Sequence, residues 1–133
     1  MHGPLRPYKL AYLWAPVIFY MAFIFFMSSF SFHFALFQKV EKSNTDKLVH
    51  VVEYSVLGLL LARALCRHTF FLDSARRVFW AALLIGALYG ATDEFHQRFV
   101  PERDSSAVDL MADSVGAALG AWVWTKKQNN VYA

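Results

Sequence analysis

The sequence predicts an all-α, polytopic membrane protein: a bundle of four transmembrane helices with an interfacial segment between the first two. The composition is the first observation, because 57% of the 133 residues are hydrophobic and the mean hydropathy is +0.34, too apolar for an ordinary soluble domain of this length. The second is a set of four long apolar runs. About 20 residues rising ~1.5 Å each cross a hydrocarbon core of ~30 Å. We expect a single domain over residues 1–133.

The expected helices cover, to within a few residues, 10–31, 47–66, 77–96 and 106–125. The first run is longer than the hydrophobic region of a secretion signal, so we expect it to remain as a helix. The other three carry charge at one end, which must lie at the interface or face the bundle interior. Residues 43–46 offer caps for the second helix, and Ser105 or Ser106 offers one for the fourth. The first loop mixes Phe and Val with Lys, Glu and His, as an interfacial segment does.

Two pairs of glycines predict close helix packing. Gly86 and Gly90 in the third helix, like Gly116 and Gly120 in the fourth, are four positions apart. Small residues on one face let two helix backbones approach each other in lipid. We therefore expect the third and fourth helices to touch closely, with Gly58 playing a similar but weaker part in the second. The alternative is that glycine is simply common in membrane helices.

The Lys and Arg residues predict the orientation. With four spans, eight of them fall on the side of the termini and five on the other, so both termini are expected in the cytoplasm and the protein in the inner (cytoplasmic) membrane. The pI of about 9.1 then reflects cations next to anionic lipid rather than a nucleic-acid surface. Membrane lipids are the expected partners, nucleic acid is not, and the oligomeric state stays open.

Nine of the ten acidic residues fall in two groups, residues 41–53 and 93–113, at the ends of apolar runs where charge is costly. Helical spacing places three sets of polar residues on one face each. These sets are Asp46, His50 and Glu53 in the second helix, Asp93 and Gln97 in the third, and Asp109 and Asp113 in the fourth. If the glycine face of the fourth helix packs on the third, the sets meet in one outward-facing polar pocket.

This many carboxylates cannot all ionise in a poorly hydrated site. Either Lys and Arg side chains neutralise them, or a metal ion neutralises them, or some of them stay protonated. The candidate catalytic residues are His50, Glu53, Asp93, Glu94 and Asp113, and the candidate ligand-binding residues are Asp46, Lys47, Gln97, Arg103 and Asp109. Histidine and carboxylate are ligand types of zinc or manganese. The spacings are not the His-Glu-x-x-His of the zinc proteases, so the sequence leaves metal and cofactor unknown.

A structural interpretation competes for some of these residues. Asp46, Lys47 and Asp109 lie in first helical turns, where acids favour the helix dipole and ion pairs merely fix a loop. Glu53 and Asp113 lie deeper, where a purely structural carboxylate costs on the order of a few kcal/mol. Structural roles are also expected for His96, Cys66 and the aromatic residues Tyr8, Tyr12, Trp14, Trp122 and Trp124 near the cytoplasmic helix ends.

The chain carries, in order, the motifs Asp46-Lys47-x-x-His50-x-x-Glu53-Tyr54-x-x-Leu57-Gly58, Asp93-Glu94-x-x-Gln97, Arg103, Asp109-x-x-x-Asp113 and Gly116-x-x-x-Gly120. In residue type and spacing it resembles the VanZ-like family of small integral membrane proteins. Two positions depart from the family pattern. Asp113 stands where the family often has Asn, and Glu102 stands where it often has Gly, in the turn that aims Arg103.

The resemblance implies a role in the cell envelope, because the family's namesake is associated with low-level resistance to the glycopeptide teicoplanin. The pocket is then expected to bind a lipid, a lipid-linked cell-wall precursor or a glycopeptide, with Lys47 and Arg103 contacting anionic groups. The alternative is an intramembrane hydrolase or transferase, metal-dependent or not, acting on a lipid-linked substrate. A small transporter or channel is the weakest hypothesis, because the four spans show no inverted repeat. Whether the protein is an enzyme stays open.

Overall fold

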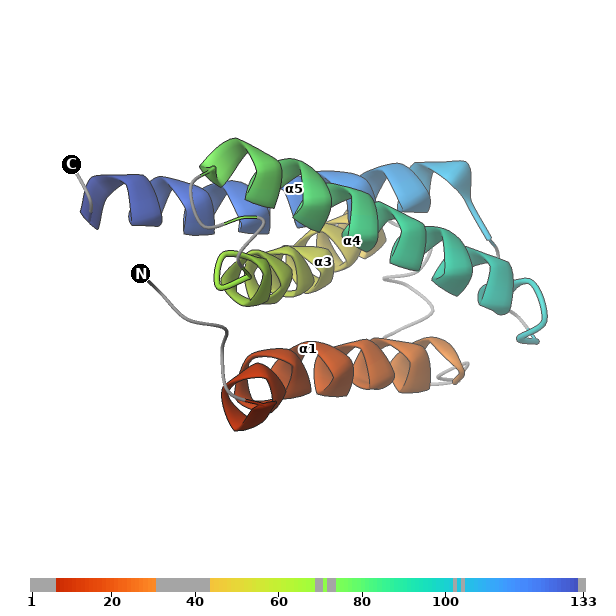
Figure 1. Cartoon of the computed structure of the whole chain (residues 1–133). Helices are drawn as coiled ribbons and strands as arrows, with labels where there is room; N and C mark the ends of the chain where they lie inside the picture. Colours follow the sequence, from red (N-terminus) through yellow and green to blue (C-terminus); the bar gives the residue numbers. More distant parts are fainter. Residues whose placement is uncertain are drawn as a thin grey trace.

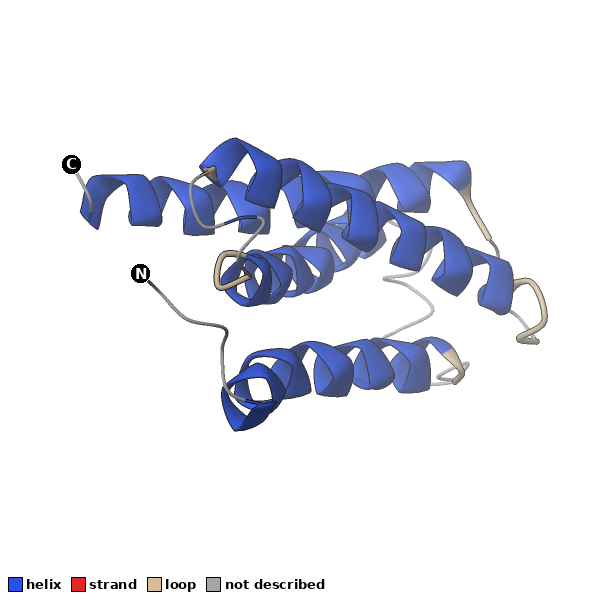
Figure 2. Ribbon diagram, in the orientation of Figure 1, coloured by secondary structure: helices blue, strands red, loops and turns tan. Residues whose placement is uncertain are grey.

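The computed structural model describes residues 7–30, 44–68, 71, 74–101, 103 and 105–131. These residues form helices and loops, and they include no strand (Figure 2). The helices are α1 (Pro7–Ser28), α3 (Asn44–Leu65), α4 (Ala75–Gln97) and α5 (Ala107–Val131). Successive helices run in opposite directions, so α1 begins and α5 ends at the same end of the bundle (Figure 1). The predicted all-α bundle is confirmed, and the helix bounds lie within three residues of those expected, except that α5 ends six residues later.

Three of the described helices are long and apolar enough to cross a membrane. The qualifying segments are Leu10–Ser28, Lys47–Leu65 and Ala75–Gln97. At 25 residues α5 is also long enough, but Asp109 and Asp113 in its first two turns make it less apolar. The protein is a membrane protein, and the crossing of the membrane by α5 stays a prediction. The expected interfacial segment falls mostly on residues 31–43, outside the described residues.

Serine side chains start two of the helices. The Ser106 hydroxyl accepts a hydrogen bond from the backbone N–H of Val108 at 3.1 Å, so the cap predicted for the fourth helix is confirmed. At the start of α4 the Ser74 hydroxyl accepts one from the N–H of Arg77 at 3.2 Å. Sequence reasoning did not single out this second cap, although Ser74 directly precedes the helix.

The closest packing joins α3 and α5, which share the most extensive interface of the bundle. A Cβ atom built on Gly120 would collide with the carbonyl oxygen of Ser55, and one on Gly116 would collide with that of Val51. The glycine face of the fourth helix, α5, was expected to pack on the third helix of the chain, which is α4. That expectation is wrong, because this face packs on α3, the second helix of the chain. Rotation of α5 is fixed by these backbone contacts, which helical spacing alone does not specify.

Glycines of the other two helices also contact α5. A Cβ atom on Gly58 of α3 would collide with the carbonyl oxygen of Ala117, so Gly58 has a full packing role and the weaker part expected for it is wrong. On α4, Cβ atoms on Gly86 and Gly90 would lie 2.6 Å from the Cβ of Ala117 and 2.9 Å from Oδ2 of Asp113. The third and fourth spans, α4 and α5, therefore touch closely as predicted. The glycines at this contact are those of α4, because Gly116 and Gly120 of α5 face α3.

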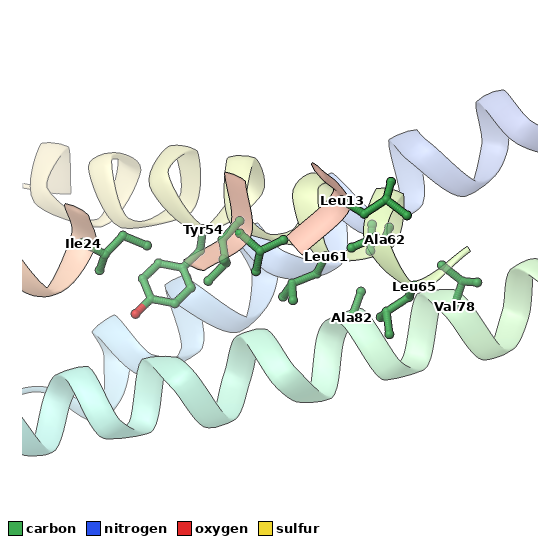
Figure 3. Close-up of a cluster of buried hydrophobic side chains, with 12 residues drawn as sticks. Leu13, Ile24, Tyr54, Leu61, Ala62, Leu65, Val78 and Ala82 are labelled. Atoms are coloured by element: carbon green, nitrogen blue, oxygen red, sulfur yellow. The ribbon is translucent and has the colours of Figure 1, made fainter. Parts of the chain in front are cut away.

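A buried apolar core lies between α1, α3 and α4. Figure 3 shows Ile24 of α1 near Tyr54 of α3 at one end of this core, and Leu13 of α1 with Leu61 and Leu65 of α3 and Val78 of α4 toward the other end. The outward faces carry exposed apolar side chains instead, as a lipid-facing surface requires. Examples are Phe19 and Phe26 of α1, Val52 of α3, Leu84 and Leu88 of α4, and Met111 and Leu119 of α5.

Polar contacts attach α1 to the other helices. The Trp14 indole N–H donates to Nε2 of His68 at 2.9 Å, and the Tyr89 hydroxyl donates to the carbonyl of Met21 at 2.5 Å. Trp14 thus bonds inside the protein, and the membrane-belt position expected for it stays a prediction. Cys66 is half-buried against the core, as the expected packed thiol.

Candidate functional site

Polar side chains from all four described helices gather at the end of the bundle where α1 and α4 end and α3 and α5 begin. We call this group the polar cluster. Its members are Ser28 of α1, Lys47, His50 and Glu53 of α3, Asp93, Glu94 and Gln97 of α4, and Asp109 and Asp113 of α5. All except Lys47 and Glu53 are buried. Buried ionisable groups at membrane depth mark functional sites by default, because their burial is costly.

His50 and Asp113 form the centre of the polar cluster. Nδ1 of His50 lies 2.8 Å from Oδ1 of Asp113, and the two residues are 7% and 0% exposed. Asp113 lies behind Gly90 of α4, whose missing side chain leaves room for the carboxylate. A carboxylate bound to one imidazole nitrogen fixes the ring's orientation and tautomer. The pair therefore presents the other ring nitrogen of His50 in a set direction.

Two further carboxylates lie beside this pair. Oδ1 of Asp109 is 3.6 Å from Nζ of Lys47, so the structure contains the structural ion pair considered for these first-turn residues. Oε2 of Glu94 accepts a hydrogen bond from the backbone N–H of Ser106 at 2.8 Å, which ties α4 to the start of α5. Among the described residues, no hydrogen-bond donor reaches Oε1 of Glu94, Oδ1 of Asp109 or Oδ2 of Asp113. Buried acceptors without donors are costly and call for an explanation.

Asp93 occupies the side of the polar cluster nearest α1. Its Oδ1 accepts a hydrogen bond from the Ser28 hydroxyl at 2.6 Å, and its Oδ2 accepts one from Nε2 of Gln97 at 3.1 Å. Sequence reasoning missed Ser28. The sequence marks Ser28 only as a hydroxyl at the end of an apolar run. Helical periodicity cannot pair it with Asp93, because the two residues lie on different helices.

Glu53 and Arg103 lie at the edge of the polar cluster. Glu53 lies one helical turn from His50 on α3, and its side chain is half-buried. The half-buried Arg103 donates from Nη2 to the carbonyl of Phe30 at 3.4 Å, and so reaches the end of α1. Tyr54, quoted in the motif but given no role, is fully buried, and no hydrogen-bond partner for its hydroxyl occurs among the described residues.

Two polar residues near the end of α4, His96 and Arg98, are not members of the polar cluster. The side chain of Asp46 is outside the described part of the structure, so its role stays a prediction. Arg98 is exposed, and its Nε lies 3.5 Å from the Ser105 hydroxyl. His96 pairs with the Ser29 hydroxyl at 3.0 Å and packs on the Phe25 ring at a centroid distance of 4.4 Å. These contacts give His96 the structural role expected for it.

One subset of the polar cluster has the composition of a metal site. His50, Glu94 and Asp109 each offer one ligand atom, and these three atoms lie within 4.8 Å of one another. One imidazole nitrogen and two carboxylate oxygens suit zinc or manganese. This grouping was not visible in the sequence, because its members come from three different helices.

Comparison with known proteins gives one match. The family model VanZ/LLP1 matches residues 13–128, a range that includes most of every described helix and the whole polar cluster. Comparison with curated proteins and with solved structures found no significant match. The resemblance stated from the motifs is thus confirmed over nearly the whole chain. The chain belongs to the VanZ/LLP1 family.

Proposed function

We propose that this membrane protein acts in the cell envelope and binds the polar end of a membrane lipid or lipid-linked envelope precursor at the polar cluster. One observation carries the proposal: buried polar side chains from every described helix, including ionisable ones from α3, α4 and α5, converge at one end of a bundle whose outer faces are apolar. A ligand with a polar group and a long apolar chain suits both surfaces at once. A small water-soluble ligand would contact the polar cluster but not the apolar outer faces.

Apolar residues beside the polar cluster support a lipid-linked ligand. Leu48, Val49 and Val52 of α3 are exposed, and they flank Lys47 and His50 along the chain. Phe95 and Phe99 near the end of α4 are exposed as well, next to Asp93 and Glu94. An acyl or polyprenyl chain can lie along these side chains while its head group reaches the polar cluster.

The family resemblance and the orientation proposal point to the outer side of the cytoplasmic membrane. The namesake of the VanZ-like family is associated with teicoplanin resistance, which concerns the envelope. The distribution of Lys and Arg supports cytoplasmic termini, and the polar cluster would then face the outer side of the membrane. Reporter fusions in the loop at Asp73 test this orientation. An active periplasmic reporter there would contradict it.

The binding proposal is tested by native mass spectrometry of the protein extracted in mild detergent. We expect a lipid or polyprenyl-phosphate adduct at one per chain, reduced at least fivefold in Asp113→Asn. Leu84→Ala, on the exposed face of α4 and far from the polar cluster, is the matched control and should keep the adduct. Adducts equal in all three proteins would identify them as bulk lipid and contradict the proposal.

A second candidate function is hydrolysis or group transfer on the same ligand, favoured by the geometry of His50 and Asp113. A histidine oriented by a buried carboxylate at 2.8 Å is the arrangement of a general base in acyl and related transfers. We expect wild-type protein to turn over a lipid-linked phosphate or ester and His50→Gln to reduce the rate about 10²–10⁴-fold. If wild-type protein turns over none of these substrates but retains the adduct, the catalytic function is contradicted and the binding function stands.

A further inference from the structure

We propose that the end of the bundle opposite the polar cluster binds the phosphate of an anionic phospholipid. The residues that carry this site are Arg63 near the end of α3, Arg67 just beyond that end, and Tyr12 near the start of α1. α3 ends and α1 starts at the end of the bundle where α5 also ends (Figure 1). The site lies away from the polar cluster, so the inference goes beyond the proposed function and does not depend on it.

Two of these side chains lie at the depth where hydrocarbon gives way to lipid head groups. Tyr12 and Arg63 are each two residues inside the end of an apolar segment, Leu10–Ser28 in α1 and Lys47–Leu65 in α3. Arginine and tyrosine near the ends of spans keep their polar tips at the membrane interface. Lipid phosphates lie at the same depth, so an arginine in this position can reach one.

Arg63 is oriented by a ring and keeps its hydrogen-bond donors available. Its side chain is half-buried, and its guanidinium carbon lies 5.2 Å from the centre of the Tyr12 ring. Within the described part of the chain, the Arg63 side chain has no carboxylate partner and donates no hydrogen bond. A guanidinium carries five N–H donors and binds phosphate oxygens in pairs. Arg63 is therefore a pre-oriented phosphate-binding group.

Arg67 supplies a second cation on the same side of α3. It follows Arg63 by four residues, which is about one helical turn. Its backbone N–H bonds to the carbonyl of Ala64 at 3.4 Å, so the turn continues beyond Leu65. The Arg67 side chain is exposed. Two arginines one turn apart can contact the oxygens of one phosphate together.

The charges at this end favour a lipid whose head group is negative overall. Arg76, Lys126 and Lys127 are exposed here as well, and the described side chains at this end include no Asp or Glu. The ammonium group of a zwitterionic phospholipid would meet these cations without a carboxylate to balance them. In the proposed orientation this end faces the cytoplasmic leaflet, where anionic lipids make the surface potential negative.

Exposed apolar side chains extend from this site toward the middle of the membrane. Phe19 lies seven residues after Tyr12 on α1, and Val56 lies seven residues before Arg63 on α3, two helical turns deeper in each case. Phe19 is 77% exposed and Val56 is 41% exposed. An acyl chain can lie along these two faces while its phosphate reaches Arg63. A water-soluble phosphate would lack the apolar contact.

The test is native mass spectrometry of the full chain in mild detergent, with lipid added after detergent exchange. Phosphatidylglycerol and phosphatidylcholine with the same acyl chains are compared. We expect one phosphatidylglycerol per chain, at least about fivefold more abundant than the phosphatidylcholine adduct and reduced about fivefold in Arg63→Gln and in Arg67→Gln. Glycerol phosphate without acyl chains should give no stable adduct. An equal adduct from glycerol phosphate, or from phosphatidylcholine, would overturn the proposal.

Lys127→Gln is the matched control, because it removes one exposed positive charge at the same end of the bundle. This variant should keep the phosphatidylglycerol adduct within about twofold of wild type. Tyr12→Leu keeps every charge but removes the ring beneath Arg63, so it should lower the adduct about two- to fivefold. Equal losses in Lys127→Gln and Arg63→Gln, with no loss in Tyr12→Leu, would indicate diffuse surface charge alone and overturn the site.

Thermal unfolding in detergent checks that each variant is folded, and the exposed Arg67→Gln decides the outcome if Arg63→Gln is not. The same spectra separate this site from the polar cluster. A phosphatidylglycerol adduct lost in Arg67→Gln and kept in Asp113→Asn belongs to the end of α3. An adduct with the reverse pattern belongs to the polar cluster, supports the proposed function and overturns this inference.

Discussion

Nδ1 of His50 on α3 and Oδ1 of Asp113 on α5 lie 2.8 Å apart, inside the interface where the two helix backbones are closest. The same contact therefore contributes to holding the helices together and to orienting the imidazole.

The His50–Asp113 pair should contribute measurably to stability. In a double-mutant cycle with His50→Gln and Asp113→Asn, we expect a coupling free energy of unfolding of about 1 kcal/mol, the range of interhelical hydrogen bonds in membrane proteins. Denaturation in mixed micelles, followed by circular dichroism, measures it. Strictly additive effects of the two substitutions would mean that the pair does not couple α3 to α5.

Gly120 should tolerate no side chain. A methyl group there meets the carbonyl oxygen of Ser55 and lies 2.7 Å from the backbone N of Leu59, so α5 must move away from α3. We expect Gly120→Ala to destabilise the bundle by about 1–3 kcal/mol. The adjacent Leu119 is exposed, and Leu119→Ala should change the unfolding midpoint little. Equal midpoints for the two variants would contradict the packing.

Gly90 offers a way to perturb the polar cluster without changing any of its residues. The added Cβ of Gly90→Ala would lie 2.9 Å from Oδ2 of Asp113 and would push the carboxylate. We expect at least about fivefold less lipid or polyprenyl-phosphate adduct, because the carboxylate that orients His50 is displaced. Gly86→Ala is the control, since its Cβ meets the Ala117 side chain instead. Similar loss in both variants would indicate a general packing defect.

Lys47 tests whether the head group of the ligand is anionic. Its Nζ pairs with Oδ1 of Asp109 at 3.6 Å, and its side chain is 41% exposed. If Lys47 contacts an anionic head group, Lys47→Gln should retain less polyprenyl-phosphate adduct than wild type in native mass spectrometry. Equal adduct in the two proteins would mean that Lys47 only pairs with Asp109.

Helical periodicity predicted which residues of one helix share a face. The structure agrees for His50 with Glu53 on α3 and for Asp109 with Asp113 on α5. It did not predict which neighbour each face meets. The glycine face of α5 packs on α3 because Gly120 and Gly116 fit against its carbonyl oxygens, and only three-dimensional packing decides that choice. The expected convergence of acids arose because Asp113 lies between both helices and contacts each.

Residues without a charge or a repeat were harder to find. Ser28 contributes a 2.6 Å hydrogen bond to Asp93, yet serine is common at helix ends and nothing in its neighbourhood marks it. The grouping of His50, Glu94 and Asp109 is equally hidden, because no spacing rule links residues on three helices. Sequence reasoning therefore located the acidic helix ends and left their pairwise contacts undetermined.

The unequal attachment of the helices sets an order of unfolding. α3 and α5 meet backbone to backbone at Gly58, Gly116 and Gly120, whereas α1 has the smallest interfaces and is held by apolar side chains and side-chain hydrogen bonds. Cooperative units of a protein open in the order of their local stability. α1 should therefore detach first, and its departure would remove Ser28 from Asp93 while His50 and Asp113 stay joined. Amides of α1 would exchange their hydrogens soonest, before the α3–α5 pair opens.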